Sequence, residues 1–349
     1  MVNKIFAWSL GLVPISLAAH FLGSSEILVF FLAALAIIPL AKFLGDATEE
    51  LASHSGAALG GLLNATFGNA TELIIAFFAL KAGLIEVVKA SITGSIIGNL
   101  LFVLGMSIFI GGLRHKKQSF NQTAAMANAS MLILAVIALV IPTVFLLTSP
   151  GLKPETIDNL SVTVAALMFI TYIASLIFIF RTHPHLYTEE VGKLKINWSV
   201  KQAVVVLTVA TVAIAVLSEI LVGAIKPTVE GLGWTELFIG AVVIAIIGNA
   251  AEHTSAIVMA VKNRMDLSLQ IAIGSATQIA MLLVPLLVFA GLLLGQDMDL
   301  VFNNFELGAI VLSIVITNLV VQDGESNWLE GVQLLAAYGI IAGAFFLHP

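Results

Sequence analysis

Two five-residue motifs place an acid and an amide in strongly apolar surroundings, GNATE at 68–72 and GNAAE at 248–252. A carboxylate at membrane depth is costly unless a partner compensates its charge, so each motif indicates a functional site. Asn69 and Glu72 are three positions apart, which puts both side chains on one face of a helix, and Asn249 and Glu252 have the same spacing. Because the motif occurs twice, we predict that Glu72 and Glu252 meet in one shared site.

Polar residues in the next apolar stretch after each motif extend the predicted site. A serine follows each glutamate at an identical spacing, and an amide lies about one helical turn further on. The candidate cation- and proton-binding side chains are therefore Glu72, Asn69, Ser95, Asn99, Glu252, Asn249, Ser275 and Gln278. All of them offer carboxylate, amide or hydroxyl oxygens, which are the ligands of Ca²⁺. The imidazole and thiolate sets typical of zinc or copper are missing.

Gly68 and Gly248 lie four positions before the two acids, and Gly60, Gly61 and Gly240 lie further upstream. These glycines weaken the helix ahead of each acid. Irregular backbone at membrane depth is tolerated only where it is buried in protein or lines a cavity. We therefore expect backbone carbonyls to complete the cation's shell, from Ala65, Gly68, Ala245 and Gly248. The alternative is that the glycines only permit close helix packing.

Charge balance suggests what such a site does. Two glutamates in a site of low dielectric constant cannot both stay ionised without a counter-charge. One divalent cation can neutralise them, and so can two protons, so the two loads compete and can be exchanged. Such antiport needs no ATP, and the sequence has no Walker motif to bind it. We expect no cofactor, with Ca²⁺ as a transported substrate held by Glu72 and Glu252.

Composition identifies the class of protein that holds these motifs. Hydrophobic residues make up 59% of the 349 residues, charged residues only 10%, and the mean hydropathy is +1.07, which indicates an integral membrane protein. The net charge of −6 comes without blocks of like charge, so no nucleic-acid partner is expected. Cysteine is absent. The expected surroundings are a lipid bilayer, and a homo-oligomer is compatible with the sequence.

Apolar stretches of about 20 residues, the length that crosses a bilayer as a helix, recur along the chain. We count eleven, at 4–22, 26–45, 55–80, 85–111, 125–147, 157–181, 200–224, 234–261, 266–292, 300–321 and 328–348. The shift that carries Glu72 onto Glu252 also carries the third span onto the eighth and the fourth onto the ninth. Each span is thus five spans before its copy, an odd number, so the two copies must cross the membrane in opposite directions, which is an inverted-topology repeat.

The predicted fold is therefore an all-α polytopic membrane protein of eleven transmembrane helices. An extra N-terminal helix (1–24) precedes a first five-helix repeat (25–181), a cytoplasmic linker (182–199) and a second five-helix repeat (200–349). In this arrangement eleven lysines and arginines fall on one side and four on the other, which predicts a cytoplasmic N-terminus and an outer C-terminus. Short loops and the lack of targeting segments suit a prokaryotic plasma membrane.

Four segments together resemble the paired alpha repeats of the cation/calcium exchanger superfamily. They are GNATEL at 68–73, GNAAEH at 248–253, GSIIGN at 94–99 and GSATQI at 274–279, and within the superfamily they look most like the calcium/proton exchangers. The resemblance implies that Glu72 and Glu252 bind Ca²⁺ and exchange protons, with the asparagines and serines nearby. The sodium/calcium branch typically has Ser or Thr where Asn69 and Asn249 stand, and an acid near Asn99 or Gln278. This sequence departs from that pattern, which favours coupling to protons over coupling to Na⁺.

A second repeated pattern concerns access to the site. The pattern [ST]-E-x-L occurs as TEEL at 48–51 and SEIL at 218–221, at corresponding ends of the first helix of each repeat. Because these helices slide to switch access in the family, the resemblance implies gate or proton-relay roles for Glu49 at the cytoplasmic mouth and Glu219 at the outer one. The alternative is ordinary solvated acids at helix ends. His253 is a candidate for tuning proton affinity, or else a packed polar residue.

The sequence thus predicts a secondary antiporter that exchanges Ca²⁺ for H⁺ by alternating access. The alternative is an exchanger of the same fold that couples Ca²⁺ or another divalent cation to Na⁺. An intramembrane enzyme using the glutamates as acid and base is disfavoured, because no nucleophile or metal-binding histidine set accompanies them and duplication would go unexplained. We do not expect an enzyme.

Overall fold

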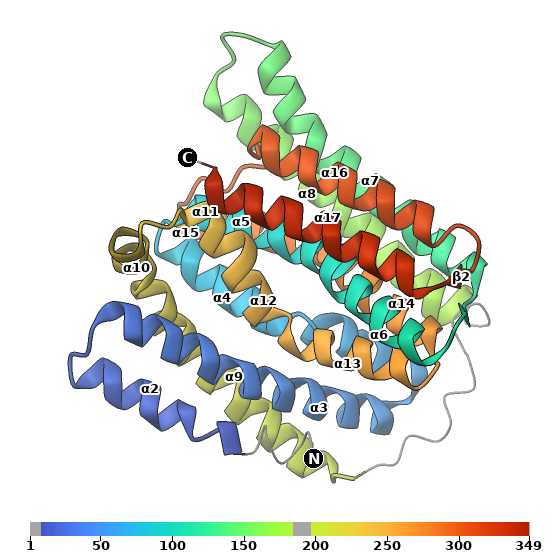
Figure 1. Cartoon of the computed structure of the whole chain (residues 1–349). Coiled ribbons are helices and arrows are strands. Elements are labelled where there is room, and N and C mark those ends of the chain that lie inside the picture. The colour runs from blue at the N-terminus through green and yellow to red at the C-terminus, as the bar shows by residue number, and fades with distance from the viewer. Residues whose placement is uncertain (1–7, 184–196, 349) are drawn as a thin grey trace.

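The computed structural model describes residues 8–183 and 197–348, without the side chains of residues 56–58, 61 and 65. The start of the first predicted span, most of the predicted linker 182–199 and Pro349 therefore lie outside the described residues. Within them nearly all of the chain is helical (Figure 1).

The helices follow one another with short turns between them. The elements before the linker are α2 (Leu12–Phe21), α3 (Glu26–Phe67), α4 (Ala70–Lys81), α5 (Ile85–Ile97), η1 (Gly98–Val103), α6 (Leu104–Arg114), β1 (Gln118–Ser119), α7 (Gln122–Thr148), α8 (Pro154–Ile177) and η2 (Phe178–Thr182). After it come α9 (Val200–Gly223), α10 (Ile225–Leu232), α11 (Glu236–Phe238), η4 (Ile239–Ile244), α12 (Ala245–Gly248), α13 (Ala250–Val261), α14 (Met265–Gln278), η5 (Ile279–Leu283), α15 (Val284–Leu294), α16 (Asn304–Val320), β2 (Glu325–Ser326) and α17 (Trp328–Leu347). The η segments are π-helical, and β1 pairs antiparallel with β2.

The described helices confirm an integral membrane protein. Seven are long and apolar enough to cross a bilayer, at Glu26–Ser55, Ile85–Arg114, Gln122–Thr148, Pro154–Thr182, Val200–Gly223, Met265–Leu294 and Trp328–Leu347. A pair bent by 120°, Ile225–Leu232 with Glu236–Gly248, raises the number to eight if it is one span. The count of eleven stays a prediction, because the breaks at Asn69 and Asn249 divide two of the expected spans into shorter helices.

Helix bounds around the two motifs repeat with the spacing of the motifs themselves. The shift that carries Glu72 onto Glu252 also carries both ends of α4 onto those of α13, and both ends of α6 onto those of α15. Helices α4 and α13 have 12 residues each, and α6 and α15 have 11 residues each. The two glutamates therefore occupy the same position in their helices, the first turn of α4 and of α13.

Two expected boundaries are wrong. The connection expected between residues 45 and 55 is helical, because α3 continues without interruption from Glu26 to Phe67. A straight helix would separate residues eight apart by about 12 Å, yet a β-carbon on Gly60 would lie 2.5 Å from the carbonyl oxygen of Ala52. The helix therefore folds back on itself between those residues. The connection expected at 225–233 is also largely helical, because α10 occupies it.

Helix α5 lies at the centre of the bundle and carries the first serine of the site. Every residue from Val87 to Ile97 is buried, as expected of a helix that is covered on all sides. Its neighbour η4 approaches so closely that a β-carbon on Gly94 would lie 1.9 Å from the carbonyl oxygen of Ala241. A β-carbon on Gly240 would lie 2.8 Å from the carbonyl oxygen of Val87 on α5. These glycines therefore permit close packing of the two helices.

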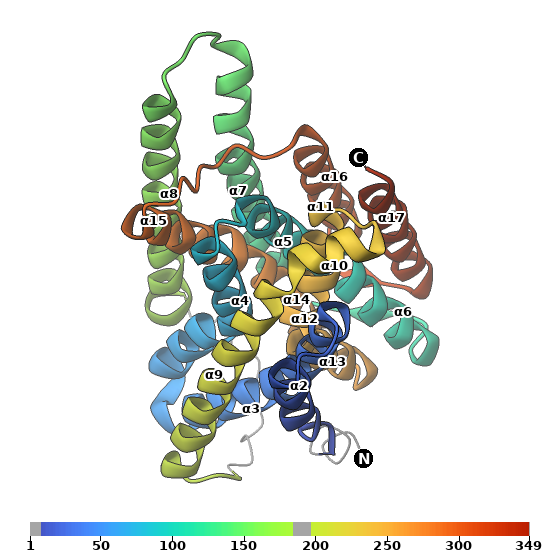
Figure 2. The ribbon, with the colours of Figure 1, turned by 90° about the vertical axis from the view of Figure 1, so that its left-hand side faces the viewer.

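The remaining helices surround this centre. α3 and α9 pack against each other on one side, and α17 packs on α6 (Figure 1). Figure 2 shows α7 and α8 projecting beyond the other helices, with their connecting turn at the far end. The centre of the bundle, between α4, α5, η4 and η5, is where the two motifs meet.

Candidate functional site

Both motifs interrupt the helices that carry them. α3 ends at Phe67 and α4 begins at Ala70, while α12 ends at Gly248 and α13 begins at Ala250. At the breaks Asn69 has φ −100° and ψ 25°, and Asn249 has φ −90° and ψ 9°, both outside the helical region. Each break starts a new helix one turn before a glutamate, where the helix dipole favours negative charge.

The two asparagines and the residues that follow the motifs form one hydrogen-bond network. Asn249 donates to Ser95 Oγ over 2.9 Å and to the carbonyl oxygen of Ala245 over 2.9 Å, and it accepts from Asn99 over 2.7 Å. Asn99 also donates to Ser275 Oγ over 3.1 Å. The network therefore joins residues from distant parts of the chain in one buried cluster.

Asn69 completes the same network from the other side. Its Oδ1 accepts from Ser275 Oγ over 2.8 Å, and its Nδ2 donates to Gln278 Oε1 over 2.5 Å. Six of the eight predicted binding side chains are thus linked, in the order Gln278, Asn69, Ser275, Asn99, Asn249 and Ser95. Asn99 Oδ1 is buried and accepts no hydrogen bond among the described residues, so it remains free to bind a cation.

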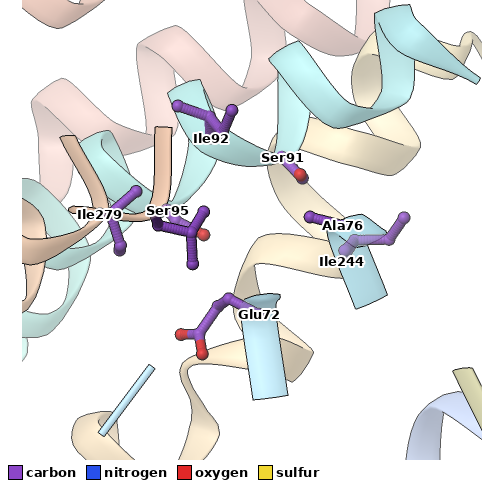
Figure 3. A pocket seen from close by; sticks show the side chains of 8 residues that line it. Glu72, Ala76, Ser91, Ile92, Ser95, Ile244 and Ile279 are labelled. Carbon is purple, nitrogen blue, oxygen red and sulfur yellow. The ribbon is translucent and has the colours of Figure 1, made fainter. Parts of the chain in front are cut away.

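Glu72 lies in a cavity beside this network. The cavity is small and is lined by Glu72, Ala76, Ser91, Ile92, Ser95, Ile244, Ile279 and Leu283. Figure 3 shows Glu72 reaching from α4 into the space below Ser95 and Ile279, with Ser91 further along α5. Glu72 is only 7% exposed, and neither carboxylate oxygen has a hydrogen-bond partner in the described part of the chain. A buried carboxylate without partners requires a counter-charge or a proton.

The second motif contacts this carboxylate directly. A β-carbon on Gly248 would lie 2.8 Å from Glu72 Cγ, so the absence of a side chain at Gly248 makes room for Glu72. Glu252 is partly buried and lies in the first turn of α13, four positions after Gly248. The structure thus brings both motifs to one place.

Three predicted residues lie apart from the cavity. Glu49 on α3 is exposed, and Glu219 on α9 is exposed with its Oε1 4.0 Å from Lys81 Nζ. His253 is buried, and its ring packs edge-on against Phe102 with 5.7 Å between centroids. None of the three lines the cavity, and neither does Glu252; of the predicted binding side chains, Glu72 and Ser95 do.

The predicted carbonyl ligands lie at or just before the helix breaks. Gly68 and Gly248 each directly precede a break, and Ala65 lies in the last turn of α3. The carbonyl oxygen of Ala245 accepts two hydrogen bonds, from the backbone and the side chain of Asn249. Ala245 can therefore bind a cation only if Asn249 turns away.

Sequence reasoning missed Ser91, which lines the cavity, and the π-helical segments η1 and η5. Ser91 lies four positions before Ser95 on the same helix face, a spacing that could have identified it. The two π-helical segments directly follow α5 and α14 and contain Asn99 and the residues after Gln278. Extra residues of this kind widen a helix and often occur at functional sites.

Fold and site together define a polytopic membrane protein with a buried, duplicated carboxylate–amide site. The family described as "Sodium/calcium exchanger protein" matches the chain at residues 25–181 and 202–347, and the chain belongs to that family. It is 49% identical over 365 aligned positions to the "Ca(2+)/H(+) antiporter" of Synechocystis sp., covering 99% of this chain and 98% of the relative. It is 46% identical to the "Ca(2+)/H(+) antiporter ChaA" of Bacillus subtilis, covering 96% of each.

Solved structures agree with this assignment. The structure of native YfkE covers 98% of this chain and 99% of its own, with a TM-score of 0.87 and 43% identity. The structure described as "Crystal Structure of H+/Ca2+ Exchanger CAX" has a TM-score of 0.71 at 18% identity and covers 99% of this chain and 93% of its own, which shows a shared fold.

Proposed function

We propose that this protein is a secondary antiporter that exchanges Ca²⁺ for H⁺ across a membrane. The observation that carries the proposal is Glu72, a buried carboxylate without hydrogen-bond partners among the described residues, which faces a cavity beside the amide and serine network and lies against Gly248 of the second motif. Relatives named as Ca²⁺/H⁺ antiporters share nearly half of its residues over almost the full length, which supports the same exchange.

Binding and exchange follow from the charges. Ca²⁺ enters between Glu72 and Glu252 and takes further oxygens from the amide and serine network and from the carbonyls of Gly68, Gly248 and Ala65. When Ca²⁺ leaves, protons replace it on the two carboxylates, because the buried pair cannot stay ionised alone. The site is thus always neutralised by one load or the other, which couples the two fluxes.

We infer that the fold comprises an extra N-terminal helix and two inverted five-helix repeats, eleven spans in all. The recurrence of helix bounds at the spacing of the motifs supports this organisation, and so do the two family-matched segments, 25–181 and 202–347, which flank the predicted linker. In such a fold the substrate lies between the repeats and access alternates. Glu49 and Glu219 then flank opposite mouths, and His253 tunes the second motif.

The balance of basic residues supports a cytoplasmic N-terminus and an outer C-terminus, and we place the protein in a prokaryotic plasma membrane. Relatives in Synechocystis and Bacillus support the bacterial setting.

Sealed vesicles containing the purified protein test the function. An imposed pH gradient should drive ⁴⁵Ca²⁺ uptake in the absence of Na⁺, and a protonophore should abolish it. Protein-free vesicles control for leakage. Uptake that requires a Na⁺ gradient and ignores pH would instead assign the protein to sodium-coupled exchange.

A further inference from the structure

Three loops at one end of the bundle are tied together around the end of α13. Strand β1 in the loop after α6 pairs with β2 in the loop after α16, and Phe120 N donates to the carbonyl oxygen of Gly324 over 2.9 Å. Lys117 forms an ion pair with Glu325. The third loop, residues 262–264, joins α13 to α14. We refer to residues 115–122, 260–266 and 322–327 as the three-loop clasp.

Gln118 links the clasp to the helix that carries Glu252. Its side chain is 1% exposed and donates to the carbonyl oxygen of Ala260 over 2.8 Å and to Asn263 Oδ1 over 3.0 Å. His115 Nε2 lies 3.3 Å from the carbonyl oxygen of Val261. The carbonyl oxygen of Ala260 also accepts from Asn263 N over 3.0 Å, so Gln118 adds a second hydrogen bond there. Together with the His115 contact, it holds the end of α13 to the clasp.

Glycine at position 111 makes this contact possible. A β-carbon on Gly111 would lie 2.1 Å from Gln118 Oε1, so any larger residue on α6 would displace the Gln118 side chain. At the start of α13, Asn249 is held by Asn99 and Ser95. Helix α13 is therefore fixed at both ends, with Glu252 between the two anchors.

The equivalent positions around α4 lack this restraint. The shift that relates Glu72 to Glu252 also relates Gln118 to Met298 and Gly111 to Gly291, where a β-carbon would lie 2.9 Å from Met298 Cβ. Met298 thus packs on its glycine as Gln118 does, but it has no group that donates a hydrogen bond. The position equivalent to His115 is Gly295, which also lacks a donor side chain.

The loop of Met298 is anchored to other helices. Lys89 on α5 donates to Asp299 and to the carbonyl oxygen of Val301, and Ser161 on α8 accepts from Leu300 N. No hydrogen bond joins this loop to α4 among the residues that the structure describes. At its loop end α4 has an exposed ion pair, Lys81 with Glu219, and such pairs contribute little.

We propose that Gln118 is a positioning residue: by fixing α13 it makes Glu252 the stationary member of the glutamate pair, while Glu72 on α4 is the member that moves during exchange. The inference rests on the proposed function, because it assigns different parts to the two acids of that site. The two motifs alone would suggest equivalent roles for Glu72 and Glu252.

Hydrogen–deuterium exchange of the purified full-length protein in lipid nanodiscs tests the asymmetry without transport. Backbone amides of residues 258–264 should exchange at least about fivefold more slowly than those of 78–84, as expected for hydrogen bonds present at one end only. Q118M should remove the difference. Equal rates in the unmodified protein, or protection of 258–264 that survives Q118M, would overturn the proposal.

Transport kinetics supply the second readout. Q118M and Q118E, which keep the size of the side chain and lose its donors, should raise the KM for Ca²⁺ about fivefold with little change in maximal rate. K117M is the matched control, because it removes a clasp contact that does not touch α13. A fall in maximal rate with KM unchanged would show that the clasp only stabilises the fold. If the unmodified protein transports no Ca²⁺, the proposed function fails, and hydrogen exchange still decides the asymmetry.

Discussion

The side-chain amide of Asn249 donates to the hydroxyl of Ser95 over 2.9 Å, across 154 residues of sequence. The equivalent positions in the repeated motifs are Asn69 and Ser275, and these are also in contact, at 2.8 Å. Each helix break is thus held by a serine from the other part of the chain. The site is built by exchange of contacts between the two motif-bearing regions, and neither region could form it alone.

Loss of Asn249 should affect binding more than loss of Asn69. Asn249 takes part in three side-chain hydrogen bonds and Asn69 in two. At about 1 kcal/mol for each bond, N249A should lower the free energy of unfolding by about 3 kcal/mol and raise the KM for Ca²⁺. Thermal unfolding and ⁴⁵Ca²⁺ uptake measure both effects. The exposed Asn64 is the control. If N64A lowered stability and uptake as much as N249A does, the hydrogen-bond network would not be important for either.

Neutralising either acid should abolish exchange while the fold persists. E72Q and E252Q keep the size of the side chain and remove the charge that sets Ca²⁺ affinity, so we expect about a hundredfold or greater loss of pH-driven uptake. Size-exclusion profiles and melting temperature should stay close to those of the unmodified protein. E155Q, at an exposed acid at the start of α8, is the control. Substantial uptake by E72Q would contradict the proposed site.

Calcium should stabilise the protein against heat, and lower pH should weaken the effect. A ligand that binds only the folded state at 100 times its Kd adds about 2.7 kcal/mol. As the pH falls, protons occupy Glu72 and Glu252 and compete with Ca²⁺, so the calcium-induced shift in melting temperature should shrink. Scanning fluorimetry from pH 8 to pH 5 tests this. A shift that does not change with pH would argue against competition at one site.

Alanine substitutions at two glycines in equivalent positions should change the stability of the protein to very different extents. A β-carbon on Gly94 would lie 1.9 Å from a backbone oxygen of η4, whereas one on Gly274 meets nothing within 4 Å. Overpacking costs about 1–3 kcal/mol or more, so G94A should lower the melting temperature and G274A should leave it nearly unchanged. Equal melting temperatures for the two variants would mean that the close packing of α5 on η4 is not required.

Breaking the partly buried ion pair of Lys89 should destabilise the protein. Lys89 is 5% exposed and its Nζ lies 2.6 Å from Asp299 Oδ1, but the Asp299 side chain is 28% exposed, so the cost should fall below the value of about 3–5 kcal/mol for a fully buried pair. K89M should therefore lower the melting temperature, and K89M/D299L should recover much of the loss. K81M, at an exposed pair, should cost under about 1 kcal/mol. Similar losses in both lysine variants would contradict this account.

The sequence alone identifies the class of fold and the chemistry of the site. Apolar stretches of bilayer length predict membrane helices because hydrocarbon tolerates no unpaired backbone. The repeated GNATE and GNAAE motifs point to Glu72 and Glu252 because buried acids are rare without a function. The seven described spans confirm the membrane fold, and the family membership agrees with an ion-exchange site.

What the sequence could not predict are contacts between segments that lie far apart in it. Helical periodicity says which face carries Asn99, and it does not say that Asn249 will be its partner. The sequence predicts the return of the chain between residues 45 and 55, but it lies nearer Gly60 because α3 stays helical through that polar stretch. The part of Gln118 in the clasp was hidden because one of its acceptors is a backbone carbonyl, which every residue has.

The span of sequence between Asn69 and its partner Gln278, 209 residues, has a consequence for biogenesis. At about 5–20 residues per second of synthesis, Asn69 and Glu72 enter the bilayer roughly 10 to 40 seconds before α14 leaves the ribosome. During that interval a nascent chain carries polar groups without their final partners, and insertion machinery or an attending chaperone must shield them. A truncated translation product would be left with an incomplete, polar interior and would be a natural target for membrane quality-control proteases.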